Sequence, residues 1–208
     1  MKKDMIILTG DEGFIGKKFL EKLSGKNVIK VEKRNSWHFR TFNQWQEVEL
    51  ILHQGAISDT TCTNLKAFNH FNVEFTERLC EQAIRYQIPI KYASSASVYG
   101  NTRKSLLSST KNHISPLNYY AITKLQMDYY IQDHIKAFSS IQSFRYFNVY
   151  GPRQPLKGTY APVVGLFLEQ FKRGEPLTIV GDGEQRRDFT HVDDVVQANI
   201  NSMMTNYS

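Results

Sequence analysis

The sequence lacks long apolar runs, has few cysteines and contains no repeats. No stretch of about 18 consecutive apolar residues occurs in the 208 residues, so we expect no membrane-spanning helix. The two cysteines are too few for a disulfide scaffold and fit a reducing, cytoplasmic compartment. The first residues, Met-Lys-Lys-Asp, lead straight into an apolar strand pattern, unlike a cleavable signal peptide.

Charge is not concentrated in any one stretch. The chain carries 26 lysines and arginines against 20 acidic residues, a formal net charge of +6. The basic residues are interleaved with acidic ones, whereas nucleic-acid-binding proteins gather theirs on one face. We therefore expect no nucleic-acid partner, and an anionic nucleotide ligand or plain solubility accounts for the excess. A hydrophobic content of 41% is enough for one sizeable core.

A glycine motif lies near the start of the chain. Met5 to Leu8 form a short apolar run typical of a buried strand, and an amphipathic helical pattern covers residues 17–23. Between them stand Gly10, Gly13 and Gly16. In this spacing the first glycine permits a tight turn, the second lets the backbone approach a pyrophosphate, and the third lets the helix pack on the strand. The motif predicts a dinucleotide-binding loop in a Rossmann-like α/β fold, a doubly wound parallel sheet.

The end of the next expected strand, residues 27–32, carries groups that could choose between NAD and NADP. Glu32 stands 22 positions after Gly10, where an acid binds the ribose hydroxyls in dinucleotide folds. Lys33 and Arg34 follow at once, and either could pair with the 2′-phosphate of NADP. Both cofactors stay open at this point, and solvated charges are an equal alternative for Lys33 and Arg34.

The remaining elements alternate between strands and helices, except in residues 35–47. That stretch is too short for a strand and its crossover helix, so we expect a rudimentary third strand. Its aromatic residues, Trp37, Phe39, Phe42 and Trp45, are expected in the local core. We expect strands at 49–52, 89–93, 143–147 and 177–180, and helices at 69–86, 116–134, 160–172 and 192–204. Residues 1–150 are then a dinucleotide-binding domain, and 151–208 a partial sugar-binding segment interleaved with the last elements of the fold.

Candidate catalytic groups follow the expected strands. Ser94 to Ser97 come where one strand ends, although serines also cap turns without any chemistry. Tyr120 and Lys124 are four positions apart and share one helical face. A phenol with a pKa near 10 is a poor base at neutral pH, and a neighbouring ammonium lowers that pKa toward a useful range. Downstream of a dinucleotide loop, the pair indicates acid–base chemistry.

Six motifs in one order carry a family resemblance. They are Thr9–Gly16, His53–Ala56, Ser94–Gly100, Tyr120–Lys124, Arg145–Arg153 and Arg187–Val195. From Met5 to Ile200 the sequence resembles the extended short-chain dehydrogenase/reductases that act on nucleotide sugars, known as NAD-dependent epimerase/dehydratases. The resemblance implies NAD or NADP as cofactor, a nucleoside-diphosphate sugar as substrate, no metal, and a homodimer. It also implies a C-terminal substrate lobe, which we expect to be small and incomplete in 208 residues.

The resemblance assigns roles to individual residues. Tyr120 is the expected acid/base, Lys124 the residue that holds the nicotinamide ribose, and Ser95 the partner of the reacting hydroxyl. Asn148, Thr159 and Arg187 are expected to bind the substrate. The expected cofactor contacts are Gly10, Gly13, Phe14, Ile15, Gly16, Glu32, Lys33, Arg34, His53, Gly55, Ala56, Asn72, Tyr120 and Lys124.

Substrate preference is divided within this resemblance. Ala96 and Ser97 stand where the family's dehydratases and decarboxylases usually carry an acid, which favours an epimerase. Residues 53–61, 116–118 and 157–158 are similar to ADP-glycero-manno-heptose 6-epimerases, whereas 165–182 is closer to UDP-sugar 4-epimerases. Lys157 matches the second catalytic lysine of the heptose enzymes, with a surface lysine as the equal alternative. A non-catalytic dinucleotide binder is the competing class.

Overall fold

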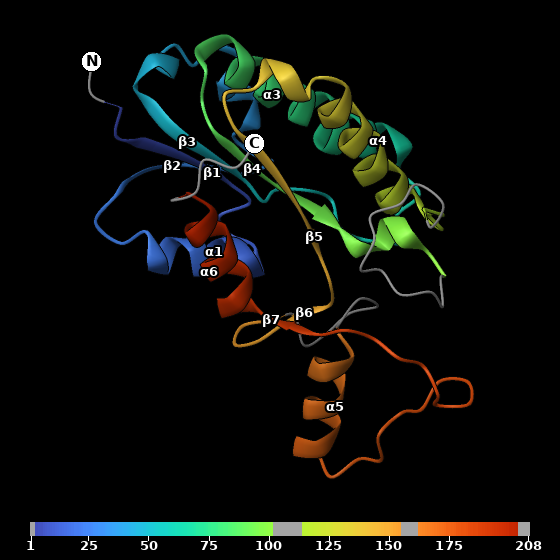
Figure 1. Cartoon of the computed structure of the whole chain (residues 1–208). Helices are drawn as coiled ribbons and strands as arrows, with labels where there is room; N and C mark the ends of the chain where they lie inside the picture. Colours follow the sequence, from blue (N-terminus) through green and yellow to red (C-terminus); the bar gives the residue numbers. More distant parts are fainter. Residues whose placement is uncertain (1–2, 102–113, 155–161, 204–208) are drawn as a thin grey trace.

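The structure, a computed structural model, describes residues 3–101, 114–154 and 162–203 (Figure 1). Its main sheet has five parallel strands in the order β2-β1-β3-β4-β5. Their bounds are β1 Met5–Thr9, β2 Asn27–Val31, β3 Val48–His53, β4 Ile90–Ser95 and β5 Ile141–Tyr146. From β1 the strand order runs to β2 on one side and to β3 on the other. The loop after β1 therefore lies at a topological switch point, where ligands bind in such sheets.

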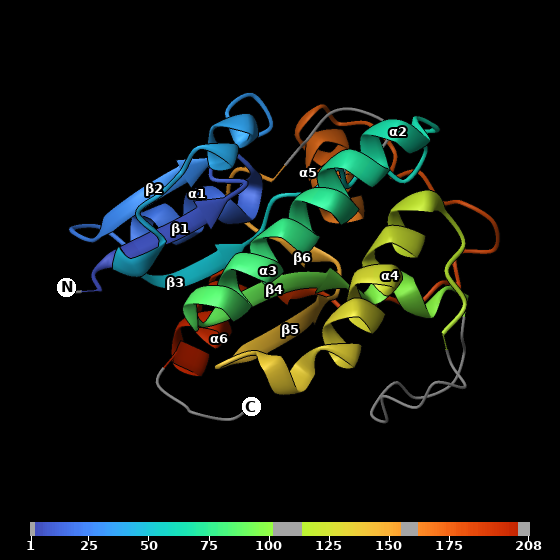
Figure 2. The same ribbon diagram turned by 90° about the horizontal axis from the view of Figure 1, so that it is seen from above.

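Helices cover both faces of this sheet (Figures 1 and 2). On one face α3 (Phe75–Tyr86) and α4 (Tyr119–Asp133) bury a cluster that includes Ile7, Leu79 and Met127. On the other face α1 (Phe14–Lys22) and α6 (Val192–Met203) cover Leu8, Leu52 and their neighbours. Side chains of successive strand residues point to opposite faces, so a strand buried on both sides must be apolar throughout. The doubly wound parallel sheet predicted from the sequence is confirmed.

The stretch 35–47 contains two short 3₁₀ turns, η1 (Ser36–Arg40) and η2 (Trp45–Glu47), and no strand. The expectation of a curtailed third strand and a missing crossover helix is therefore confirmed. Phe39, Phe42 and Trp45 pack on one another with ring centroids 4.9–5.6 Å apart, and they join the α3 side of the core. The side chain of Trp37 lies outside the described part of the structure.

The helix expected at 69–86 starts earlier and is irregular. It consists of α2 (Leu65–Phe68), a π-helical turn η3 (Asn69–Glu74) and α3, with Asn64 capping the start through its side-chain oxygen. A π turn changes which side chains face inward, and it occurs frequently at functional sites. Here it buries the amide of Asn72 beside the loop that follows β3.

The prediction of a strand at 177–180 is wrong. These residues have no regular structure, and Ile179 and Val180 are 71% and 73% exposed. A strand needs a neighbouring strand for its backbone groups. Here the Thr178 N–H donates to the Gln170 side chain and the Val180 carbonyl accepts from Gln185 instead. Helix α5 (Val163–Lys172), shorter than the expected 160–172, also lies away from the sheet in Figure 1.

Two short strands bring the chain back to the core after α5. β6 (Val149–Tyr150) and β7 (Thr190–His191) pair in parallel, and α6 follows immediately. Lys18 of α1 contacts Asp193 at 2.6 Å, and Arg153 pairs with Glu21 of α1. These contacts fix the return of the chain against α1. Among the described residues, no helix is long and apolar enough to cross a membrane.

Two isoleucines test this division between core and surface. Ile7→Ala removes a side chain with no exposed surface from the central strand and should lower the free energy of unfolding by about 2–5 kcal/mol. Ile179→Ala, in the exposed segment, should change it by less than about 0.5 kcal/mol. Urea unfolding followed by circular dichroism measures both. Equal losses at the two positions would contradict the absence of a strand at 177–180.

Candidate active site

A cleft of about 1980 Å³ lies along the carboxyl edge of the sheet. Because all five strands are parallel, the loops after β1, β2, β3, β4 and β5 meet at this edge. The expected site residues that line the cleft are Gly10, Gly13, Phe14, Ile15, Gly16, Glu32, Lys33, Gly55, Ala56, Ser95, Tyr120, Lys124, Asn148 and Arg187. The structure thus brings together residues from both halves of the chain.

Two positions of the glycine loop, Gly10 and Gly16, have no room for a Cβ. Gly10 has φ +72°, and a Cβ there would lie 2.8 Å from the Cα of Gly55. A Cβ on Gly16 would lie 2.0 Å from the carbonyl oxygen of Gly10. The loop after β1 and the loop after β3 therefore touch through bare backbone, and the first turn of α1 packs against them.

This geometry fits the pyrophosphate of a dinucleotide. Helix α1 begins at Phe14 with Gly13 as its N-cap, no side chain caps its first N–H groups, and Gly13 to Gly16 line the cleft. Its first turn carries no acidic residue. Unpaired N–H groups and the positive end of the helix dipole favour an anion at this position.

Charged residues gather where β2 ends. The Glu12 backbone N–H donates to Glu32 Oε1 at 2.8 Å, and the Arg34 guanidinium pairs with both carboxylate oxygens of Glu12. The ammonium of Lys33 lies 5.8 Å from the centre of the Phe71 ring. Glu32 is therefore held against the glycine loop, whereas Arg34 lies outside the lining of the cleft.

Two expected cofactor contacts, His53 and Asn72, lie beneath the cleft and do not line it. The buried His53 ring is hydrogen-bonded to Thr9 at 2.6 Å and to Thr76 at 2.8 Å. Burial, and then the charge of Lys124, lower the pKa of His53 to about 3, so it is neutral at pH 7. These side chains support the cleft from below. His53 is the last residue of β3 and its side chain is buried. The sequence alone could not show whether His53 belongs to the strand or to the loop that follows it.

Asn72 organises the loop after β3 by three hydrogen bonds. Its side-chain oxygen accepts the Ile57 N–H at 2.8 Å, and its amide nitrogen donates to the Ile57 carbonyl and to Thr123 of α4. The π turn, the loop and α4 are thereby tied together one helical position away from Lys124. Asn72 thus positions the loop that carries Ala56.

Tyr120 and Ser95 lie together at the end of β4. Burial raises the pKa of Tyr120 above its ordinary value of 10, and a hydrogen bond with Ser95 opposes that rise. The Ser95 hydroxyl also accepts from the N–H of Ser97 and contacts the Ser97 hydroxyl at 2.9 Å. The lowering of this pKa by Lys124 that the sequence predicted is therefore not found, and Tyr120 is a neutral phenol at pH 7.

Lys124 is buried beside Tyr120, with its ammonium 6.0 Å from the Tyr120 ring centre and 4.7 Å from that of Tyr92. Its Nζ donates to the Ala93 carbonyl at 2.6 Å. Burial lowers its pKa from 10.5 to about 8, and the charge of Asp128 partly opposes this shift. The amine is thus placed between Tyr120 and the strand end, with a proton that is less firmly held than in water.

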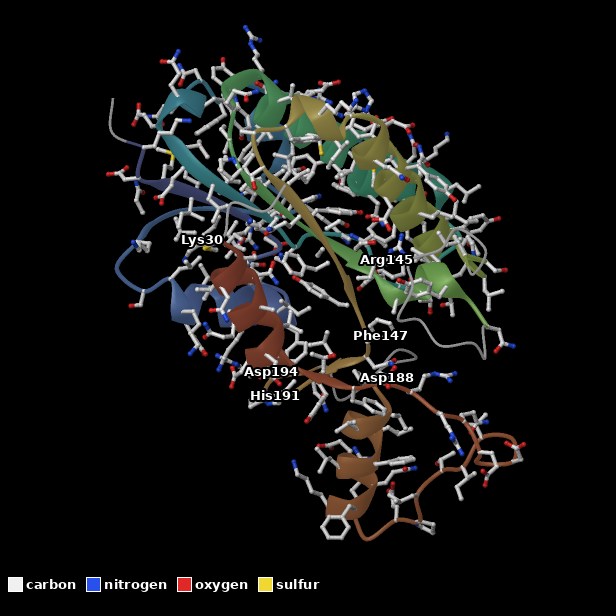
Figure 3. The ribbon with its side chains drawn as sticks, in the orientation of Figure 1. Lys30, Arg145, Phe147, Asp188, His191 and Asp194 are labelled. Atoms are coloured by element: carbon white, nitrogen blue, oxygen red, sulfur yellow. The ribbon has the colours of Figure 1, made fainter. Side chains whose placement is uncertain are left out.

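The expected substrate residues are partly described. The Asn148 side chain donates to the Asp188 carbonyl at 2.8 Å, where Phe147 and Asp188 approach each other in Figure 3. Arg187 lines the cleft and is exposed, and its guanidinium contacts the Arg186 carbonyl. Thr159 and Lys157 lie outside the described residues.

Sequence reasoning missed a polar chain across the floor of the cleft. The Tyr146 hydroxyl contacts Gln54 Oε1 at 3.0 Å and Asn199 Nδ2 at 2.9 Å, and Gln54 and Tyr146 line the cleft. Within the described part of the chain, Gln54 Nε2 is buried and has no hydrogen-bond partner. No periodicity or spacing joins three residues so far apart in the chain, although Gln54 and Tyr146 stand in motifs already singled out.

Fold and site together define a dinucleotide-binding enzyme with a tyrosine–lysine pair. The chain belongs to the NAD dependent epimerase/dehydratase family, whose model matches residues 6–207. It is similar, with 36% identity over 94% of this chain and 70% of the relative, to an ADP-L-glycero-D-manno-heptose-6-epimerase of Brachyspira hyodysenteriae. These findings confirm the family and the epimerase class predicted from the motifs. The description of the family names NAD, one of the two cofactors that the sequence left open.

Solved structures give the same fold. The Helicobacter pylori ADP-L-glycero-D-manno-heptose-6-epimerase has a TM-score of 0.81 and 29% identity, covering 98% of this chain and 74% of that one. The Thermotoga maritima UDP-glucose 4-epimerase has a TM-score of 0.80 and 28% identity, covering 96% and 73%. A UDP-N-acetylglucosamine 4-epimerase of Methanobrevibacter ruminantium, at 24% identity, has a TM-score of 0.86 over all of this chain and 75% of its own.

The lowered pKa of Lys124 predicts a pH dependence of stability. The group is charged when unfolded up to about pH 10.5, whereas burial disfavours that charge in the fold, so folding is penalised below pH 8 and the penalty fades as pH rises. Relative to Lys124→Met, the wild-type free energy of unfolding should rise by about 2–3 kcal/mol from pH 7 to pH 10. Urea unfolding at both pH values measures this, with the exposed Lys136→Met as control. If the difference in free energy of unfolding between wild type and Lys124→Met did not change with pH, the lowered pKa of Lys124 would be contradicted.

Proposed function

We propose that the chain is an NAD-dependent nucleotide-sugar epimerase of the ADP-heptose 6-epimerase type. The observation that carries the proposal is the single cleft lining shared by the glycine loop, Ser95, Tyr120 and Lys124. The cradle at α1 suits a pyrophosphate, and the tyrosine lies at the far end of the same cleft. When bound, NAD supplies a reversible oxidant for the sugar carbinol.

The residues of the chain would then divide the remaining work. Tyr120 takes the proton of the reacting hydroxyl and returns it, while Ser95 orients that hydroxyl. Lys124 holds the nicotinamide ribose, and its positive charge favours the phenolate once a ligand excludes water from the cleft. Asn148, Thr159 and Arg187 would bind the nucleotide sugar, with the guanidinium of Arg187 suited to its diphosphate. We propose that residues 151–208 supply this part of the substrate lobe.

Two adjacent tyrosines test the catalytic assignment. Tyr120→Phe removes the acid/base and should lower turnover about 100- to 10,000-fold with little change in NAD affinity. Tyr119→Phe, whose side chain is 43% exposed, should keep near-normal turnover. Product formation followed by NMR measures the rates, and calorimetry the affinity. A loss below tenfold in Tyr120→Phe would rule out its role.

A UDP-hexose 4-epimerase is the second candidate. The curated relative at 36% identity is a heptose 6-epimerase, whereas the solved heptose and UDP-glucose epimerases give comparable folds at 29% and 28% identity. A 4-epimerase can work with one tyrosine, because the keto-sugar turns and offers its other face. A heptose 6-epimerase resembles a system with a second acid/base, for which Lys157 is our candidate.

A substitution at Lys157 therefore distinguishes the two candidate functions. Lys157→Met should abolish epimerisation of an ADP-heptose, because it removes the second acid/base, and should leave NAD binding unchanged. Lys172→Met, at the exposed end of α5, is the matched control and should remain active. Incubation with ADP-heptose and with UDP-glucose, followed by NMR, gives the readout. Full heptose activity in Lys157→Met, or activity on UDP-glucose alone, would transfer the assignment to the 4-epimerase.

A homodimer in the cytoplasm completes the proposal. Helix α4 exposes large apolar side chains, including Ile122 at 45% and Tyr129 at 41%, which a partner's helix could cover. Cys62 and Cys80 are both free thiols, as expected in a reducing compartment. Light scattering of the purified chain tests the dimer, and a monomer at micromolar concentration would contradict it.

A further inference from the structure

Three carboxylates gather beside the glycine loop. Asp11 and Glu12 stand between Gly10 and Gly13, and the Glu12 N–H is bonded to the carboxylate of Glu32. Asp11 is buried, and Glu12 and Glu32 line the cleft. Burial, and next the charge of Glu32, raise the pKa of Asp11. Three carboxylates therefore stand at the end of the cleft where a ribose acid is expected.

Arg34 is engaged by one of these carboxylates. Its Nη1 donates to Glu12 Oε2 at 2.9 Å, and its Nη2 pairs with Glu12 Oε1. A two-point pair uses the N–H groups with which a guanidinium would bind a phosphate. The charges of Glu32 and Asp11 also act on Arg34 and favour its cationic form. The guanidinium N–H groups of Arg34, which the sequence suggested for a 2′-phosphate, are thus paired with Glu12.

The exposed Arg34–Glu12 ion pair alone would oppose the binding of a 2′-phosphate only weakly. Pairs of this kind contribute little to stability, so a phosphate could compete for Arg34 if nothing else opposed it. Here the opposition comes from the acids themselves, because a phosphate monoester carries about −1.5 to −2 charges at neutral pH. The nearby cations are Lys30 and Lys33, and the Lys33 ammonium faces the Phe71 ring.

We propose that Glu12 is a specificity-determining residue that makes the cleft select NAD over NADP. It pairs with Arg34 and, with Glu32, adds the negative charge that disfavours a 2′-phosphate. The neutral 2′-hydroxyl of NAD meets no such repulsion and can donate to a carboxylate. The inference rests on the proposed dinucleotide site and goes beyond it by naming which dinucleotide is rejected, and how.

The test is calorimetric titration of the purified chain with NAD⁺ and NADP⁺, a readout independent of turnover. The wild type should bind NAD⁺ at least about tenfold more tightly than NADP⁺. Glu12→Gln should tighten NADP⁺ binding about five- to tenfold and leave NAD⁺ binding within about twofold. The double variant Glu12→Gln with Arg34→Ala should lose most of that gain, because only the relief of repulsion remains once Arg34 is removed. Glu21→Gln, which breaks the comparable Arg153 pair elsewhere on α1, is the control and should change neither affinity.

Three results would overturn the inference. They are a wild type that prefers NADP⁺, an unchanged ratio of the two affinities in Glu12→Gln, and an NADP⁺ gain that survives removal of Arg34 undiminished. A wild type that binds neither dinucleotide would instead contradict the proposed function. The two failures are therefore distinguishable in one experiment.

Discussion

The close approach of bare backbone at Gly10, Gly16 and Gly55 is the constraint on which the rest of the structure depends. At Gly16 a Cβ would lie 2.0 Å from the Gly10 oxygen, far inside van der Waals contact. The loop after β1 and the start of α1 can therefore meet only with glycines at positions 10 and 16, and the loop after β3 approaches Gly10 through the backbone of Gly55. Their meeting places the N-terminus of α1 at the edge of the sheet and opens the cleft next to it.

The two ends of that cleft use charge in opposite ways. Beside β2 the charges of Arg34 and Glu12 are paired and exposed, so they add little to the stability of the fold. Beside α4 the ammonium of Lys124 is buried among Tyr92, Tyr120 and the Ala93 carbonyl, and burial works against its charge. The same burial raises the pKa of Tyr120. Burial thus disfavours the charged form of both residues, the phenolate of Tyr120 and the ammonium of Lys124.

Much of the fold and of the cleft could be predicted from the sequence. The buried strand before Gly10 and the residues after β3 and β4 carry local signals, and parallel topology then forces strand ends together. Nothing local identified Glu12 as the partner of Arg34, since two separate loops must fold before they meet. The π turn at Asn72 has no sequence signature. The segment 177–180 has the composition of a strand, but composition does not supply the neighbouring strand that its backbone requires.

The described contacts also explain how a substrate lobe can be added without disturbing the cofactor half. Helix α6 follows that lobe in the chain, yet Val192, Val196 and Asn199 are fully buried in the main core. Asn199 reaches through Tyr146 to Gln54 on the floor of the cleft. The β6–β7 pair and the contact of Lys18 with Asp193 hold both ends of the inserted segment. Because the chain leaves and re-enters the core beside the cleft, the proposed substrate residues Asn148 and Arg187 line the cleft while the sheet and the glycine loop stay unchanged.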